Sequence, residues 1–219
     1  MRMFEVRLWL SKQGRIKYVS HLDMFRLMQR AVRRAEIPLW YTEGFNPHPY
    51  ISFLLALSLG TEGLREPVDI RIVDDMTPEE IKNRLNGAMP EGLKIEAVTT
   101  PVYKPAAIAF GSYRVYYGGV TESELFDALT CGELTCEKSG KKGNKKITKT
   151  VNVSEHIKSF EIRAEDGKTV LDVVLPAGSV FNLNPQQLTC AVSARLGRDI
   201  TAQRVIRLGL LTDELKPFE

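Results

Sequence analysis

Cysteine is scarce in this sequence, and no long apolar run occurs. The 219 residues include three cysteines, Cys131, Cys136 and Cys190, an odd number that is too small for a disulfide framework and fits small buried apolar side chains. The longest apolar run, residues 53–59, is far shorter than the roughly 18 residues that span a bilayer. Residues 1–10 alternate charged and apolar side chains, whereas a signal peptide has a continuous apolar stretch. The sequence therefore predicts a soluble cytoplasmic protein.

Motifs that would identify a reaction are also missing. The sequence has no P-loop, no GxGxxG dinucleotide fingerprint and no GxSxG nucleophile elbow. The cysteines fit neither the CxxxCxxC spacing of a radical SAM iron–sulfur enzyme nor, together with His156, the paired spacing of a zinc site. The aromatic RNP1 motif of an RNA-recognition domain is absent as well. No cofactor is therefore expected, and the sequence alone assigns no reaction.

Positive charge gathers in two segments, although the net charge is only +3. Residues 1–36 hold nine Lys and Arg against three acids, and residues 137–149 hold six Lys against one acid. The second segment also contains two glycines, which favours a loop or a hairpin tip, and its candidate nucleic-acid-binding residues are Lys141, Lys142, Lys145 and Lys146. This asymmetry indicates a polyanionic partner, and solvated basic surface is the alternative for either cluster.

Hydrophobic periodicity and turn residues divide the chain into two similar halves. The strands expected in residues 1–104 are 4–10, 39–42, 52–57, 68–73 and 93–98, with helices after the capping residues Ser20 and Thr77. Residues 105–219 repeat the order, with strands near 112–117, 134–137, 160–162, 170–175 and 204–210 and helices at 122–129 and, capped by Asn184, 185–196. With short extras set aside, both orders are βαββαβ. The sequence predicts an α+β fold of two ferredoxin-like halves packed together, although the halves show no convincing residue-by-residue identity.

The first helix is expected to have an apolar face and a basic face. The residues expected on its apolar face are Leu22, Phe25, Met28, Val32 and Ala35. Arg26, Arg30 and Arg33 are spaced four and three residues apart, which places them on one stripe opposite that face. Three guanidinium groups in a row suit the phosphates of a nucleic-acid backbone and do not read its sequence. The alternative is a solvated face whose arginines pair with the acids of residues 74–80.

A second candidate site is the loop Gly-Phe-Asn-Pro-His-Pro-Tyr at residues 44–50. Its two prolines stiffen the backbone and hold Asn46 and His48 in fixed directions, and Phe45 and Tyr50 flank them. His48 can exchange a proton near neutral pH, and His21 and Asp23 at the helix start would complete a weak acid–base or metal site if the fold brings them close. A chance grouping and a purely structural crossover remain the alternatives.

Three motifs in the first third of the chain carry a family resemblance. They are KYVSHLDMFR at 17–26, RAVRRA at 30–35 and YTEGFNPHP at 41–49. Together they resemble the bacterial radical-SAM-linked protein family of unknown function, and a looser likeness continues to the C-terminal strand. The resemblance implies an accessory role beside a separate radical SAM protein in RNA or ribosome modification. It supplies no established activity and no catalytic residues.

Three functional hypotheses follow. The leading one is an RNA-binding accessory module that acts with a separate radical SAM enzyme. The second is an RNA-directed enzyme that uses His21, Asp23 and His48, and the third is a protein adaptor that binds no nucleic acid. The positions of the two histidines and Asp23 in the fold distinguish the second hypothesis from the others.

Overall fold

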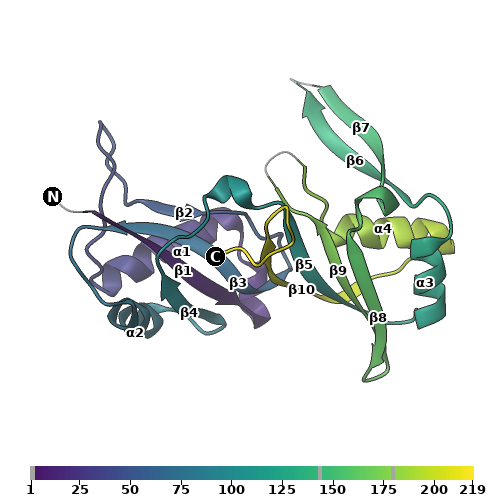
Figure 1. Cartoon of the computed structure of the whole chain (residues 1–219), viewed down its shortest axis with the longest axis horizontal. Coiled ribbons are helices and arrows are strands. Elements are labelled where there is room, and N and C mark those ends of the chain that lie inside the picture. Colours follow the sequence, from purple (N-terminus) through teal and green to yellow (C-terminus); the bar gives the residue numbers. More distant parts are fainter. Residues whose placement is uncertain (1–2, 143–144, 179–180) are drawn as a thin grey trace. The chain divides into compact units, whose positions relative to one another are not determined.

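The chain forms two compact α+β units (Figure 1). The computed structural model describes residues 3–142, 145–178 and 181–219, with the side chains of residues 138–149 outside the described part. Unit 1 consists of Met1–Ala107 with Lys216–Glu219, and unit 2 of Ile108–Leu215. No helix in the described ranges is long and apolar enough to cross a membrane.

Unit 1 is an antiparallel sheet with two helices packed on one face. Its strands lie in the order β4-β1-β3-β2, and every pairing between them is antiparallel. The core between sheet and helices is built from alternate strand residues such as Leu8, Leu10 and Ile70. In chain order the elements are β1 (Phe4–Lys12), α1 (His21–Arg34), β2 (Ile51–Phe53), β3 (Glu62–Ile72), α2 (Pro78–Ala88) and β4 (Leu93–Thr99).

The strand expected at residues 39–42 is reduced to two isolated bridges, Leu39 to Ile72 and Tyr41 to Pro49. The segment leaves β3 after Trp40, whose amide donates to the Arg71 oxygen at 2.8 Å, and then enters the Gly- and Pro-rich loop. β2 is likewise shorter than the expected strand 52–57. These two expectations were wrong because the chain turns into loops that end the strand pairing early. The alternation of apolar and polar residues does not indicate where such a loop begins.

The buried stripe of α1 begins later than expected. Met24, Met28, Ala31 and Val32 are buried, with the i, i+4, i+7, i+8 spacing of one helix face. Leu22, which was expected on this face, is 58% exposed, so that assignment was wrong. The buried residues of α1 begin at Met24, and Leu22 in the first turn faces solvent.

Part of the outer face of the unit 1 sheet is also buried, although the alternation of β1 predicted one buried face and Glu5 on the outer face is exposed. Arg7 and Trp9 alternate with Leu8 and Leu10 and are 0% and 2% exposed. The Arg7 guanidinium forms a two-bond fork with Asp69, at 2.7 and 2.9 Å. The Phe218 ring centroid lies 4.7 Å from Arg7 Cζ. The C-terminal segment therefore covers this face at Arg7.

Unit 2 repeats the strand order of unit 1 and adds a hairpin. Its sheet order is β10-β5-β9-β8, with antiparallel pairing throughout, while β6 and β7 form a separate two-stranded sheet. Figure 1 shows β6 and β7 projecting away from the rest of unit 2. The elements are β5 (Phe110–Tyr117), α3 (Glu122–Thr130), β6 (Thr135–Lys142), β7 (Lys145–Asn152), β8 (Ser159–Glu165), β9 (Lys168–Pro176), α4 (Pro185–Leu196) and β10 (Ala202–Leu211).

The structure also reveals residue-level correspondence between the units that the sequence comparison missed. On the first strand of each unit an arginine faces an aspartate of the third strand. The second helix of each unit begins with a capping residue followed by proline. The corresponding residues are Arg7 and Asp69 with Arg114 and Asp172, and Thr77-Pro78 with Asn184-Pro185.

Candidate nucleic-acid interface

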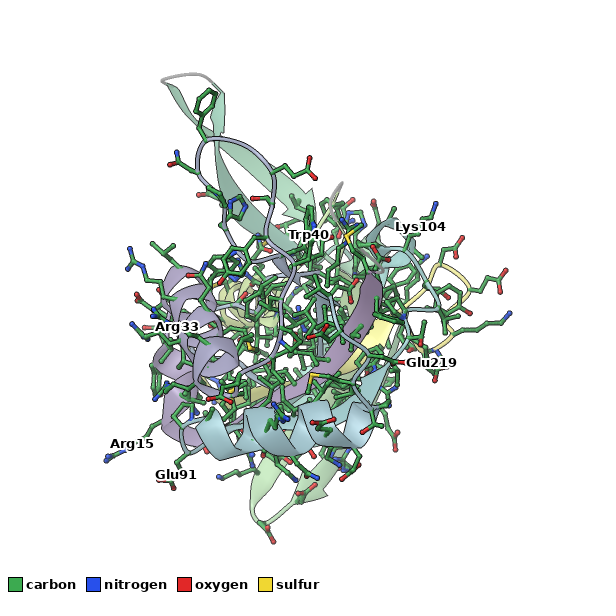
Figure 2. All side chains as sticks on the ribbon, turned by 90° about the vertical axis from the view of Figure 1, so that its left-hand side faces the viewer. Arg15, Arg33, Trp40, Glu91, Lys104 and Glu219 are labelled. Carbon is green, nitrogen blue, oxygen red and sulfur yellow. The ribbon has the colours of Figure 1, made fainter. Side chains whose placement is uncertain are left out.

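The arginines of α1 are exposed, but they are not equivalent. Arg26 forms an ion pair with Asp23 at 3.2 Å, and both side chains are more than half exposed. In the part of the chain that the structure describes, Arg30 and Arg33 form no ion pair, and no arginine of α1 pairs with residues 74–80. Figure 2 shows Arg33 on the outward side of α1. Two of the three predicted arginines are therefore exposed without an ion pair, although Arg30 is near enough to Asp23 to help lower the pKa of that carboxyl.

A groove between α1 and α2 collects further arginines. It has a volume of about 770 Å³ and is lined by Arg30 and Arg34 of α1 and by Arg84 of α2. Leu27, Met89 and Pro90 are among its apolar lining residues. Of the predicted stripe, only Arg30 reaches this groove. The spacing of Arg34, one turn after Arg30, could have indicated it, whereas Arg84 lies fifty residues further on and no local pattern connects it to α1.

Arg84 is held in place at the groove by two contacts. Its Nη2 donates to the Glu80 carboxylate at 2.6 Å, one helical turn earlier, and its Nη1 to the Glu36 backbone oxygen at 3.5 Å. The Arg34 Nε donates to the Arg30 backbone oxygen at 3.4 Å. Arg30 and Arg34 form no ion pair among the described residues, so the groove has an excess of positive charge.

One acidic residue, Glu36, also lines the groove, and its backbone conformation is costly for a glutamate. Glu36 follows α1 with a φ of 52°, in the left-handed region that favours glycine. Its amide donates to the Arg33 oxygen and the Ile37 amide to the Val32 oxygen, both at 3.2 Å, which is the Schellman arrangement at a helix C-terminus. A negative charge at this end of a helix also opposes the helix dipole.

The loop at residues 44–50 is anchored at its base and exposed at its tip. The His48 amide donates to Thr42 Oγ1 at 3.2 Å, and the Thr42 amide donates to the His48 oxygen at 2.9 Å. Tyr50 lies under the Arg71 guanidinium, with the Arg71 Cζ 4.2 Å from the ring centroid. Phe45, Asn46 and His48 are exposed. In Figure 1 this loop, which precedes β2 in the sequence, extends away from the body of unit 1.

His21, Asp23 and His48 have separate partners. The His21 ring packs edge-on against Phe53, with centroids 5.5 Å apart. Asp23 accepts a hydrogen bond from the Ser20 hydroxyl at 2.7 Å, and His48 Nδ1 lies 3.0 Å from Thr42 Oγ1. No contact among the described residues joins the three, and no cluster of three or more His, Cys, Asp or Glu side chains there could hold a metal ion.

The environment of Asp23 keeps it ionised. The hydrogen bond from the Ser20 hydroxyl, followed by that from Arg26, lowers the pKa of this carboxyl below its usual value. Ser20 Oγ accepts from the Asp23 amide, which confirms the predicted helix cap. A carboxyl with a lowered pKa is a poor general acid, so the local chemistry of Asp23 is that of a helix start.

Lys12 is a buried cation that the sequence did not indicate. It is 5% exposed, and its Nζ donates to the Val19 oxygen at 3.0 Å. Burial lowers the pKa of Lys12, and the nearby Glu66 carboxylate acts in the opposite direction. These two side chains and His21 line a hollow of about 30 Å³. That volume is the share of one water molecule in the liquid, so the hollow is too small for a nucleotide.

The lysines of the second basic segment lie in the β6–β7 hairpin. Their side chains are outside the described residues, so the predicted contacts of Lys141, Lys142, Lys145 and Lys146 stay a prediction. The backbone register places Lys141 opposite Lys146 and Lys142 opposite Lys145.

The comparisons with known proteins concern the fold and the family. No curated protein matches the chain. Among solved structures, a chain of the crystal structure of a Cbf5-Nop10-Gar1 complex is similar, with a TM-score of 0.54 and 12% sequence identity. The match covers 94% of the present chain and 49% of that chain, so the protein spans about half the length of this neighbour. At this identity the likeness shows the fold alone. A family model matches residues 5–185, and the chain therefore belongs to the bacterial family described as "Uncharacterized protein conserved in bacteria (DUF2344)".

Proposed function

We propose that this protein binds RNA through the arginines of α1 and α2 and acts as an accessory module for a separate radical SAM enzyme. The observation that carries the RNA proposal is the groove, where Arg30 and Arg34 form no ion pair in the described part of the chain and Arg84 completes the basic lining. Guanidinium groups bind phosphate oxygens through paired donors. The radical SAM partner comes only from the family resemblance of the three N-terminal motifs.

The fold of the two units supports a role in RNA binding, because it leaves the helix face of unit 1 accessible. We further propose that both units are ferredoxin-like, because each has the βαββαβ order and the antiparallel strand order 4-1-3-2 once β6 and β7 are set aside. In unit 1 the Arg7 face of the sheet is covered by the C-terminal segment, which leaves the helix face for a large ligand. The enzyme hypothesis built on His21, Asp23 and His48 gains no support from their separate contacts.

A salt titration of RNA binding tests the proposal. A variant with Arg30, Arg34 and Arg84 replaced by Gln should bind less tightly than wild type. Its plot of log affinity against log salt should be flatter by about 2, because each lost contact on a single strand removes about 0.7 from the slope. The matched control replaces three exposed cations away from the groove, Arg15, Lys104 and Lys168, and changes the net charge equally.

The two variants separate site binding from general charge. An equal loss in both would assign the affinity to overall charge and contradict the groove as the site. Wild-type protein with no RNA affinity at low salt would reject the RNA proposal and favour the protein adaptor.

A further inference from the structure

The groove between α1 and α2 combines two kinds of group that bind a nucleotide, cationic and apolar side chains. Arg30, Arg34 and Arg84 can receive a phosphate, and Leu27, Met89 and Pro90 offer apolar surface for a base. The volume of about 770 Å³ lies within the range of small-ligand sites, roughly 300–1,000 Å³. The remaining charged side chain is Glu36, which a pure phosphate site would exclude because its charge repels the ligand.

Glu36 occupies a backbone position that glycine would fill at lower cost. Its φ of 52° and its place at the C-terminal end of α1 both oppose a glutamate there. Backbone outliers that persist in a fold are a reason to look for a function of the residue. Its backbone oxygen receives the Arg84 hydrogen bond, while its carboxylate has no ion pair within the described residues. Glu36 is exposed and lines the groove, so its carboxylate can turn toward a bound ligand and accept hydrogen bonds there.

We propose that the groove holds one nucleotide of a single-stranded RNA and that Glu36 selects guanine. Guanine presents two adjacent donors, N1–H and the N2 amino group, which match the two oxygens of a carboxylate. Adenine, cytosine and uracil each lack this pair of donors on their Watson–Crick edge. Single-stranded RNA is commonly recognised on that edge, with the base packed against side chains and the phosphate held by arginine. This inference rests on the proposed RNA binding and names the base class for the same site.

Nucleotide titration of the full chain tests the selection. Proton–nitrogen NMR spectra of wild-type protein would be recorded with GMP, AMP, IMP and inorganic phosphate. GMP should bind roughly tenfold more tightly than AMP, since a paired hydrogen bond to one base edge discriminates against the wrong base. IMP lacks the N2 amino group and should lie between them. The shifted signals should come from the last turns of α1 and α2.

Glu36→Gln is the decisive variant, because it keeps the side-chain size and removes the second acceptor. Its amide NH2 group meets the guanine donors and suits the adenine edge, so GMP should lose its advantage over AMP. Glu79→Gln removes an exposed acid from the first turn of α2 without touching the groove, and should keep the preference. Circular dichroism spectra matching wild type would show that both variants fold.

Equal wild-type affinity for GMP and AMP, or a preference that survives Glu36→Gln, would overturn the guanine assignment. Oligouridine contains no guanine, so its binding tests the RNA proposal separately from the guanine assignment. If salt-dependent oligouridine binding persists while GMP shows no preference, the guanine inference fails and the RNA proposal stands. If neither ligand binds, both fail.

Discussion

Units 1 and 2 place the same ion pair in two different environments. Arg7 and Asp69 face each other in unit 1 as Arg114 and Asp172 do in unit 2, each with two hydrogen bonds of 2.7–2.9 Å. The Arg7 side chain is completely buried, whereas that of Arg114 is 32% exposed. The pair is therefore part of the repeated architecture, and its surroundings decide how much it contributes to stability.

The difference has a clear structural origin. Arg7 also donates to the backbone oxygens of Glu219 at 2.7 Å and Tyr103 at 3.0 Å, both from segments that follow the βαββαβ elements of unit 1. In unit 2, Asp172 instead receives a second arginine, Arg163, at 2.8 Å. One unit covers its arginine with chain segments, and the other shares its carboxylate between two half-exposed cations.

The largest expected effect is at Arg7. Arg7→Ala should lower the free energy of unfolding by about 3–5 kcal/mol, because it leaves Asp69 without its cation in a mostly buried position. The matched change Arg114→Ala should cost about 1 kcal/mol, since its partner keeps Arg163 and all three side chains reach solvent. Urea unfolding of both variants measures the difference. Equal losses would show that covering this face adds nothing to the pair.

Phe218 tests the covering segment directly. Its ring is 2% exposed, packs on Arg7 and lies 6.0 Å from the Tyr103 ring. Phe218→Ala should cost about 3 kcal/mol through lost burial and a residual cavity. Leu215→Ala is the control, since Leu215 is 46% exposed and its truncation should change stability by less than about 0.5 kcal/mol. Similar thermal melts for the two variants would contradict a structural role for the C-terminal segment.

The helix starts were predictable from the sequence, whereas the burial of Arg7 by the C-terminal segment was not. Ser20, Thr77 and Asn184 all accept the expected hydrogen bond from a backbone amide, because a cap involves residues only three apart. Arg7 looked like a solvent-facing strand residue because Phe218 lies more than two hundred residues away. The local pattern also placed residues 134–137 within the expected βαββαβ order, but they begin the separate hairpin, and β8 takes the position beside β9.

The candidate groove shows the same limit. Arg30 was identified from helical spacing, but Arg84 joins it only because α1 and α2 pack side by side on one sheet face. Glu36 had no sequence signal, since its left-handed backbone is visible only in three dimensions. A sequence pattern identifies the charged residues on one face of one helix. Which charged residues of different helices lie at the same site depends on how the helices pack.

The first helix of each unit begins with a different cap, and the difference should be measurable. In unit 2, Thr121 and Glu124 form a full capping box, with the Thr121 amide donating to the Glu124 carboxylate at 2.9 Å. In unit 1, Asp23 accepts from the Ser20 hydroxyl instead. Ser20→Ala should cost about 1 kcal/mol in thermal unfolding, and Thr121→Ala at least as much. An unchanged melting curve for Ser20→Ala would argue against a stabilising cap.

The smallest expected effect is the acid dependence of the Asp172 network. Burial raises the pKa of this carboxyl, but the hydrogen bonds from Arg114 and Arg163 outweigh burial, so its pKa lies below the usual value. A lowered folded-state pKa contributes stability that is complete above the unfolded value of about 3.9 and is lost as the pH falls through the folded value. The network should therefore weaken below about pH 4, and Asp172→Asn should flatten the fall in unfolding free energy between about pH 4 and pH 2. Arg163→Gln should flatten it partly, because Arg114 still holds the carboxylate. If the unfolding free energies of wild type and Asp172→Asn fall in parallel with pH, the half-exposed pair in unit 2 adds no pH-dependent stability. Only the buried Arg7 pair of unit 1 would then contribute to stability.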